Sequence, residues 1–169
     1  MQTLLPDCSV RKLQPVNADI EKIYAMASQN TLFYQYHPPF VTWQSILDDM
    51  SALPPGKTMA DKFYIGFFDG AALAAVVDMI LAYPNETTGY IGFFMVDKSR
   101  QGQGIGSRIL ADIENTMRNN GMCHSRLAVD KGNPQSYSFW TKNGYAVCGP
   151  VIPNDFSAYI PMQKELTPL

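Results

Sequence analysis

The sequence predicts a mixed α/β domain, in which helices flank one central sheet. Two apolar segments separated by Asp69-Gly70 predict a β-hairpin, because Asp-Gly favours a tight reversal between strands. The apolar run 90–96 predicts a strand that is buried on both faces. Segment 105–117 repeats apolar residues at helical spacing, which predicts an amphipathic helix packed on the sheet.

Length and composition fit one globular domain over residues 1–169. A chain of 169 residues can bury most of its apolar surface in a single core. Apolar residues make up 46% of the chain and charged residues 17%, which is typical of a folded protein. There is no internal repeat, low-complexity segment or linker. We therefore expect no second domain.

Charge and cysteine content narrow the classes of partner and the compartment. A net charge of -2 argues against broad affinity for nucleic acid or anionic membranes. The start, Met1–Asp7, has neither the charged nor the apolar region of an export signal, and no run of about 18 apolar residues exists. The three cysteines are widely spaced, which suits a reducing compartment. We expect a soluble, cytoplasmic protein without nucleic-acid or membrane partners.

The remaining elements follow from periodicity and turn residues. Asn17 is expected to cap the first helix, and the aromatic segment 33–43, broken by Pro38-Pro39, to form a loop or short helical pieces. The central helix is expected to end near Asn119-Asn120-Gly121. Strands are expected at 9–14, 63–68, 73–81, 125–129, 145–151 and 157–163, and helices at 45–53 and 136–141.

A glycine-rich turn, Gln101–Ser107, lies between the buried strand and the amphipathic helix. Glycine lets the backbone approach a ligand, and unpaired amides at a helix start carry the positive end of its dipole. The turn is therefore a candidate phosphate or pyrophosphate site. Lys98, Arg100 and Arg108 flank it and make a local basic region.

Two other phosphate-binding motifs fit this turn poorly. A dinucleotide fingerprint from Gly102 needs glycine or alanine at Ser107, and one from Gly104 needs it at Ile109. A P-loop requires Gly-Lys followed by Ser or Thr, which the chain lacks here. A nucleotide-binding regulatory domain stays an alternative, and it predicts that ATP or NAD binds more tightly than CoA.

Two segments together resemble the GCN5-related N-acetyltransferase (GNAT) superfamily. Gln101, Gly104 and Gly106 match its acyl-CoA signature [RQ]-x-x-G-x-[GA], and Phe94–Asp97 resembles its bulged strand. Asn133–Tyr145 resembles its segment N-x-x-[AS]-x-x-[FL]-Y-x-K-x-G-F. The resemblance covers about residues 90 to 146. It implies a twisted sheet of about six or seven strands, antiparallel at one side and parallel at the other.

The resemblance also implies acetyl-CoA as the acyl donor, without a metal. The pyrophosphate would rest on the turn and the helix start, and the pantetheine on strand backbone, where the amide of Met95 or Val96 would polarise the thioester carbonyl. Asn133 would contact the pantetheine arm, although Asn before proline is equally suited to capping a helix. The implied contacts are Phe94, Met95, Val96, Gln101, Gly102, Gln103, Gly104, Ile105, Gly106, Ser107, Asn133 and Ser136.

The implied activity is acetyl transfer to a primary amine by direct attack in a ternary complex, because no nucleophile for a covalent intermediate stands out. Trp140 occupies the position of the family's acidic tyrosine. A non-catalytic acyl-CoA sensor is therefore the alternative. Tyr137, one helical turn earlier, is the substitute acid, and Asp78 is the first candidate base, ahead of Glu86 and His37.

The acceptor itself has no recognisable signature. A small-molecule or peptide amine fits, and the resemblance also allows a homodimer. The aromatic segment, with Phe33, Tyr34, Tyr36 and Trp43, would either line an acceptor pocket or build core. Residues 29–54 and 152–158 are expected to carry the specificity.

Overall fold

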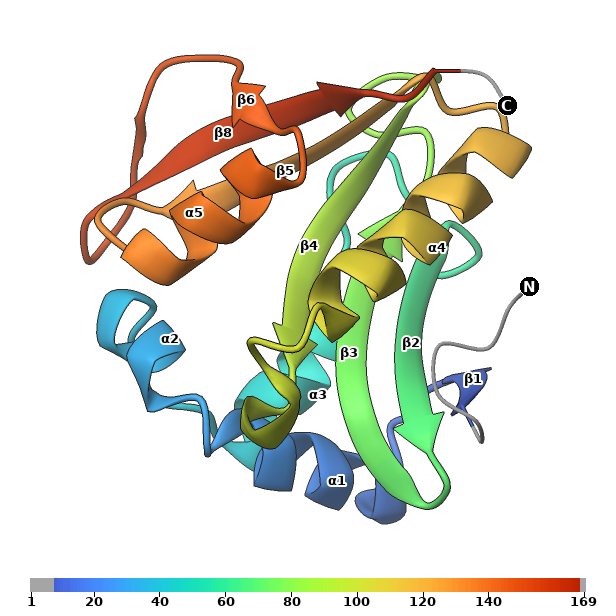
Figure 1. Cartoon of the computed structure of the whole chain (residues 1–169), viewed down its shortest axis with the longest axis vertical. Helices are drawn as coiled ribbons and strands as arrows, with labels where there is room; N and C mark the ends of the chain where they lie inside the picture. The colour runs from blue at the N-terminus through green and yellow to red at the C-terminus, as the bar shows by residue number, and fades with distance from the viewer. Residues whose placement is uncertain (1–7, 168–169) are drawn as a thin grey trace.

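The computed structural model describes residues 8–167 (Figure 1). Met1–Asp7, where we expected no export signal, lies outside the described residues. The elements are β1 (Cys8–Lys12), α1 (Asn17–Ala27), α2 (Thr31–Tyr36), α3 (Trp43–Ser51), β2 (Lys62–Asp69), β3 (Ala72–Ile80), β4 (Thr88–Val96), the 3-10 helix η1 (Lys98–Arg100), α4 (Ile105–Asn119), β5 (His124–Asp130), α5 (Pro134–Lys142), β6 (Ala146–Val147), β7 (Ile152–Pro153) and β8 (Ala158–Glu165).

The strands form one mixed sheet, which confirms the predicted fold class. Their order is β1-β2-β3-β4-β5-β8-β6, with β7 also paired to β8. Each described pair is antiparallel except β4 with β5, which is parallel and is joined through α4. The sheet has eight strands rather than six or seven. The difference arises because the predicted strand 145–151 is reduced to the short β6, and a further short strand, β7, follows Gly149-Pro150.

Two element starts differ from the prediction. Asn17 is the first residue of α1, and the cap position is Val16, which provides no side-chain cap. The aromatic segment forms α2 and the start of α3. Thr42 and Ser45 make a capping box, in which each side chain accepts the other's backbone N–H. This box begins α3 at Trp43, before the predicted start at 45.

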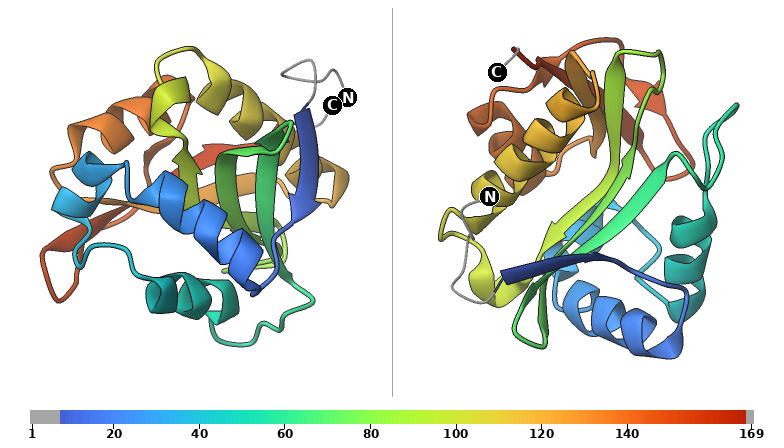
Figure 2. Two further views of the ribbon diagram at one scale, coloured as in Figure 1. Left: turned by 90° about the horizontal axis from the view of Figure 1, so that it is seen from below. Right: turned by 90° about the vertical axis from the view of Figure 1, so that its right-hand side faces the viewer.

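Helices cover both faces of the sheet (Figure 2). On one face, α4 and α5 pack Ile109, Met117 and Trp140 against the strands. On the other face, α1 and α3 pack Ile23 and Ile46. Full burial of such a side chain contributes about 1.5–3 kcal/mol, so each helix is held mainly by its apolar stripe.

The sheet opens between β4 and β5. The two strands pair only where Thr88–Tyr90 lies beside His124–Arg126. Beyond that point β5 continues along β8 as far as Asp130, while β4 runs on beside β3. Gly92 adds one residue to β4 opposite Asp78 and Met79, and such a bulge bends and twists a strand. The result is a gap beside the second half of β4.

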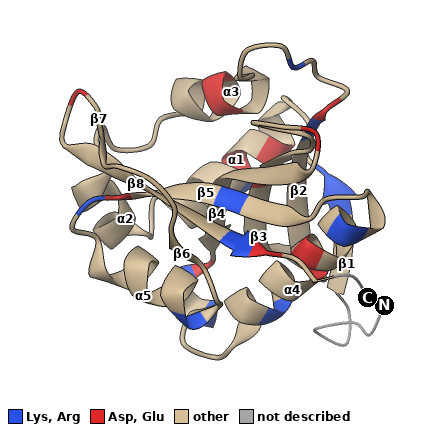
Figure 3. Ribbon diagram, turned by 90° about the horizontal axis from the view of Figure 1, so that it is seen from above, with Lys and Arg blue, Asp and Glu red and all other residues tan. Residues whose placement is uncertain are grey.

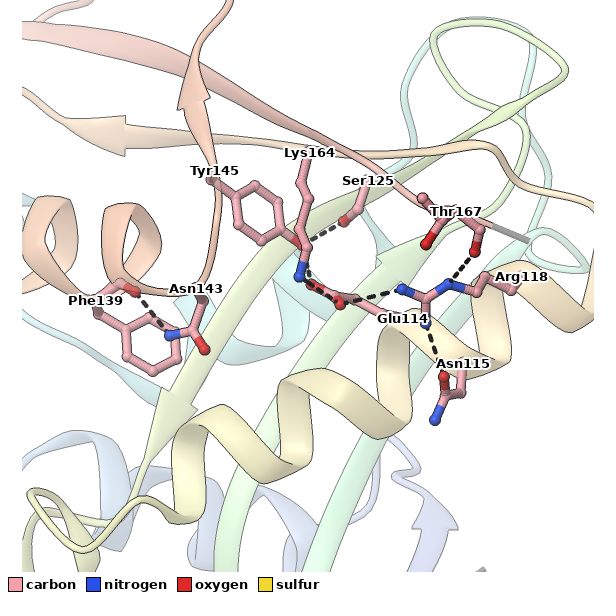
Figure 4. Close-up of polar contacts among 9 residues, drawn as sticks. All are labelled: Glu114, Asn115, Arg118, Ser125, Phe139, Asn143, Tyr145, Lys164 and Thr167. Carbon is pink, nitrogen blue, oxygen red and sulfur yellow. Dashed lines mark hydrogen bonds and ion pairs between the residues drawn. The ribbon is translucent and has the colours of Figure 1, made fainter. Parts of the chain in front are cut away.

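A buried polar network links α4 to β5 and β8 (Figure 4). Lys164 Nζ donates to both oxygens of the Glu114 carboxylate at 2.9 and 2.8 Å. Tyr145 Oη donates to Ser125 Oγ at 2.7 Å and lies 3.2 Å from Glu114 Oε1, with Arg118 3.8 Å from Glu114 Oε2. Glu114 therefore has protein partners for both oxygens although it is 4% exposed.

No helix within residues 8–167 has both the length and the apolar character needed to cross a membrane. In the same range, no three His, Cys, Asp or Glu side chains gather in a way that could hold a metal ion.

Candidate active site

A cleft of about 370 Å³ occupies the gap between β4 and β5. Most of its walls come from the second half of β4, the glycine-rich turn with the start of α4, and one side of α5, and the start of α2 with the residue before it adds Asn30 and Phe33. Figure 1 shows these three meeting beside β4. The lining residues are Asn30, Phe33, Phe94, Met95, Val96, Gln101, Gly102, Gly104, Gly106, Ser107, Gln135, Ser136, Ser138, Phe139, Trp140 and Lys142.

The glycine-rich turn presents bare backbone to this cleft. Gly102 and Gly104 have φ of 74° and 79°, a region that glycine adopts without a steric penalty. A Cβ at either position would meet no atom within 4 Å, so the space above the turn is open. Gly104 is the N-cap of α4 and offers no side-chain cap. The amides of Ile105–Ser107 thus have no helical partner and lie at the positive end of the helix dipole.

Gln101 braces the turn against its surroundings. Its Nε2 donates to Asn30 Oδ1 at 2.6 Å and to the Val96 carbonyl at 2.9 Å. Its Oε1 accepts from Gln135 Nε2 at 3.1 Å. The first residue of the signature therefore links the α1–α2 connection, β4, the turn and α5. Asn30 and Gln135 carry no sequence signal for this role, because their partners lie 71 and 34 residues away.

The open edge of β4 directs backbone groups toward the cleft. Asp97 N–H donates to the Ala74 carbonyl on β3 at 2.8 Å. Successive residues of a strand direct their backbone groups to opposite sides, so Val96 and Phe94 face away from β3. The bonds from Gln101 and Asn30 to the Val96 carbonyl agree with this direction. Of the two amides considered from the sequence, Val96 rather than Met95 faces the gap.

The basic residues around the turn divide into distinct roles. Arg100 makes an ion pair with Asp69 at 2.7 Å, so its charge is directed to the β2–β3 hairpin. Lys98 and Arg108 do not line the cleft. Lys142, on α5, does line it. It lies within the second matched segment, which is the signal that could have identified it from the sequence.

Asn133 acts as a helix cap. Its Oδ1 accepts from the backbone N–H of Gln135 at 3.1 Å and of Ser136 at 3.2 Å, and Pro134 is the first residue of α5. The side chain is 1% exposed and is not part of the cleft lining. Ser136 does line the cleft. Asn133 therefore positions α5, and a direct contact with the pantetheine arm stays a prediction.

The structure brings Trp140 to the cleft but leaves Tyr137 outside it. The Trp140 indole is 7% exposed and packs edge-on against Tyr145, with ring centroids 5.0 Å apart. Tyr137 is 43% exposed and does not line the cleft. The hydroxyls that do line it belong to Ser107, Ser136 and Ser138. No tyrosine hydroxyl is among the described lining residues.

Asp78 lies on the α1–α3 face of the sheet, against the β4 bulge. Its Oδ2 accepts from Lys62 Nζ at 2.8 Å, whereas Oδ1 is buried without a partner among the described residues. Burial raises the pKa of the Asp78 carboxyl, and Lys62 partly offsets this. A Cβ at Gly92 would come within 3.0 Å of Oδ2, so only the missing side chain leaves room for the carboxylate there. Asp49, on α3, also has a pKa raised by burial and by Asp78.

The other two candidate bases, Glu86 and His37, do not line the cleft. Glu86 is exposed on the turn before β4 and is not part of the cleft. His37 Nδ1 lies 3.0 Å from Asp130 Oδ1, and this hydrogen bond raises the pKa of the imidazole above its usual range. The imidazole also packs against Phe33, which lines the cleft.

A splayed strand, an uncapped helix start and an open glycine turn define a site for an acyl-CoA transferase. The sequence profile of the acetyltransferase (GNAT) family matches residues 21–145. The chain therefore belongs to the GNAT family of acetyltransferases and is an acetyl-CoA-dependent N-acetyltransferase. The cradle of free amides and open space fits CoA as the donor.

Solved structures share the fold at low sequence identity. An acetyltransferase from Thermus thermophilus is 16% identical with a TM-score of 0.73, covering 98% of this chain and 100% of its own. Ard1 from Thermoplasma volcanium is 21% identical with a TM-score of 0.70, covering 95% and 99%. PaiA N-acetyltransferase from Thermoplasma acidophilum, solved with coenzyme A, is 20% identical with a TM-score of 0.68, covering 94% and 98%. No curated protein matches the sequence.

Proposed function

We propose that this chain, as one domain over residues 1–169, transfers the acetyl group directly to a primary amine within a ternary complex in the cytoplasm. The observation that carries the proposal is the cleft itself, which runs from the glycine turn through the gap in the sheet to Phe33 on the opposite side. A donor held on one side and an amine approaching from the other would meet beside the β4 backbone. Acetyl-CoA supplies an activated acyl group there as a thioester.

The donor would be held mainly by backbone. The amides of Ile105–Ser107 would bind pyrophosphate, with Gly102 and Gly104 leaving room for it. Phe94 and Val96 would pair with the pantetheine arm along the open edge of β4. The Val96 N–H would stabilise negative charge on the carbonyl oxygen, an effect worth about 10²–10³ in rate for one such donor. Lys142 would add a cation at the α5 side.

Asp78 would accept the proton of the attacking amine through water. Its unpartnered Oδ1 is available to accept a proton, and its raised pKa makes the carboxylate a stronger base than an exposed one. The adjacent Gly92 keeps the carboxylate against the bulge of β4, two residues before Phe94.

The departing thiolate would take its proton from water. A thiol has a pKa of about 8.5, so it leaves far more readily than an amine and needs no strong side-chain acid. Tyr137, the acid suggested from the sequence, lies outside the cleft, and Trp140 has no acidic proton to give. Replacing Tyr137 with Phe tests the earlier suggestion directly, and we expect kcat to be unchanged.

In the alternative, a non-catalytic acyl-CoA sensor, the protein binds the donor in this cleft but transfers no acetyl group. Titration calorimetry with acetyl-CoA, followed by thiol release over a panel of amines with mass analysis of the products, separates the two. We expect N-acetylated product and initial-velocity lines that intersect when both substrates are varied. Binding of acetyl-CoA without thiol release for any amine would support the sensor. Parallel lines would instead indicate a covalent acetyl-enzyme. Sedimentation tests the homodimer that the family resemblance allows.

A further inference from the structure

A second cavity, of about 110 Å³, lies beside the end of α2. It is enclosed by the last residues of α2, the end of β5 and the turn between β7 and β8. Figure 1 shows this turn reaching toward α2, and Figure 2 shows the same approach from below. Its side chains combine three aromatic rings, two carboxylates and an imidazole: Tyr36, Phe156, Tyr159, Asp130, Asp155 and His37.

Carboxylates outnumber basic groups in this cavity: the His37 imidazole is bonded to Asp130, which leaves Asp155 as the second carboxylate. Asp130 and Asp155 line it, and no Lys or Arg is among its described lining residues. The acidic turn stands out beside β7 in Figure 3. Burial raises the pKa of the Tyr159 hydroxyl, and Asp130 and Asp155 raise it further, so the field of both carboxylates reaches the ring. Aromatic faces attract organic cations, and a nearby carboxylate adds charge attraction.

Hydrogen bonds between residues of the cavity walls hold these residues in place. His37 Nδ1 lies 3.0 and 3.1 Å from the two oxygens of Asp130, whose side chain is 10% exposed. Asn154 Oδ1 accepts from the backbone N–H of Phe156 at 3.0 Å and of Ser157 at 2.7 Å, which shapes the turn. Asp155 has no hydrogen-bond or ion-pair partner within residues 8–167 and is exposed, so its charge is available to a ligand.

The cavity adjoins the acetyl-transfer cleft. The ring of Phe33 lines that cleft, and its centroid lies 5.1 Å from the His37 ring, which lines the cavity. Phe33 also contacts Phe93 on β4, at 5.8 Å between centroids. An acceptor that placed one end in the cavity could pass Phe33 and bring its other end to the gap beside β4.

We propose that this cavity binds a cationic group of the acceptor other than the amine that is acetylated. The acceptor class is then an aliphatic amine with at least two ammonium groups. This inference rests on the proposed function, and it adds the acceptor's chemistry to it. A cavity of this size, lined by carboxylates and aromatic rings, fits a compact ammonium group better than a large planar cation.

The test compares linear α,ω-diamines with n-alkylamines of the same chain length. One charge contact in a wet site is worth about 1 kcal/mol, so we expect wild-type kcat/KM to favour the best diamine by at least about fivefold. Asp155→Asn should reduce that ratio to near one while leaving the alkylamine rate unchanged. Phe156→Ala should also lower the diamine-to-alkylamine ratio. Glu165→Gln, which removes an equal charge at the far end of β8, is the matched control and should keep the ratio.

The outcomes are distinct. Equal kcat/KM for diamines and alkylamines in the wild type, or a preference that Asp155→Asn leaves intact, would overturn the inference while acetyl transfer itself stands. A lack of transfer to either class, with acetyl-CoA binding retained, would instead remove the proposed function on which the inference rests.

Discussion

The two faces of the sheet each bury a carboxylate, and the two are bonded very differently. On the α4–α5 face, Glu114 has Lys164, Tyr145 and Arg118 around both oxygens. On the α1–α3 face, Asp78 has Lys62 on one oxygen and no partner among the described residues on the other. Both side chains are almost enclosed, at 5% and 12% exposed.

This difference in bonding indicates different roles for the two carboxylates. A buried polar atom without a partner costs about 1–3 kcal/mol, and folded proteins keep few of them. The satisfied Glu114 network joins α4, β5 and β8, and none of its residues lines the cleft. The Asp78 side chain, on β3, lies beside the β4 bulge and does not line the cleft, so a water would have to link its unsatisfied oxygen to an amine there. We infer that Glu114 stabilises the fold, and that Asp78 is retained for proton transfer.

The largest effect is expected from Asp78→Asn. Loss of a general base lowers kcat/KM for the amine by about 100- to 10,000-fold, measured as thiol release with saturating acetyl-CoA and amine concentrations varied below KM. The substitution also leaves the buried Lys62 ammonium without an anion, which costs about 3–5 kcal/mol of unfolding free energy.

The double variant Asp78→Asn with Lys62→Met separates these two effects. It should regain most of the unfolding free energy in denaturant titration while staying inactive. Recovery of activity together with stability would show that Asp78 acts only through the fold.

Gly104→Val should weaken CoA binding by about 10- to 100-fold in calorimetry, because φ near +79° costs a β-branched residue about 1–3 kcal/mol and distorts the amide cradle. Gly121→Val is the matched control: it has φ of 81°, no atom within 4 Å of its Cβ, and lies at the other end of α4. Both variants should lose similar stability, but only the first should lose affinity. Unchanged affinity in Gly104→Val would exclude the turn as the pyrophosphate site.

Glu114→Gln should lower stability without lowering kcat. It leaves Lys164 and Arg118 without their anion, and because these cations are 27% and 16% exposed the loss should be about 1–3 kcal/mol. Thermal and denaturant unfolding measure the loss, and thiol release at a temperature where both proteins are folded measures kcat. A drop in kcat comparable to that of Asp78→Asn would erase the contrast between the two carboxylates.

Among the effects on activity, Lys62→Met should produce the smallest, a shift in pH dependence. Lys62 lowers the pKa of Asp78, so its removal raises that pKa further. A base must be ionised to accept a proton, so the acidic limb of the kcat/KM profile should move to higher pH. The plateau at high pH should be little changed. An acidic limb at the wild-type position would mean that another group titrates there.

The elements and the donor side were largely predictable because their signals are local. Asp69-Gly70 specified the β2–β3 hairpin, and the repeat from Ile105 to Met117 specified α4. The turn Gln101–Ser107 works through backbone conformation, which neighbouring residues set. The break of the last strands at Gly149-Pro150 was missed because it depends on where those strands pair with β8. The capping box at Thr42 is local, but it was missed because its third residue is Ser45 rather than the usual Glu or Gln.

The rest of the site depends on residues that meet only after folding. Gln101 bonds to Asn30 across 71 positions, and His37 to Asp130 across 93. Tyr137 and Ser138 are adjacent in the sequence, yet only Ser138 lines the cleft, because the packing of α5 on the sheet selects its inner side. No spacing rule could distinguish them.

The sequence by itself determined the sheet with its flanking helices, the family and the glycine-rich turn that we propose binds CoA, because periodicity and glycine conformation act over a few residues. Tertiary structure alone decided which amide of β4 faces the gap, that Asp78 meets Lys62 beside the bulge, and that α2 joins an acidic, aromatic cavity to the cleft. Those features arise from contacts between distant segments. Their energies depend on burial and direction, which only the folded chain defines.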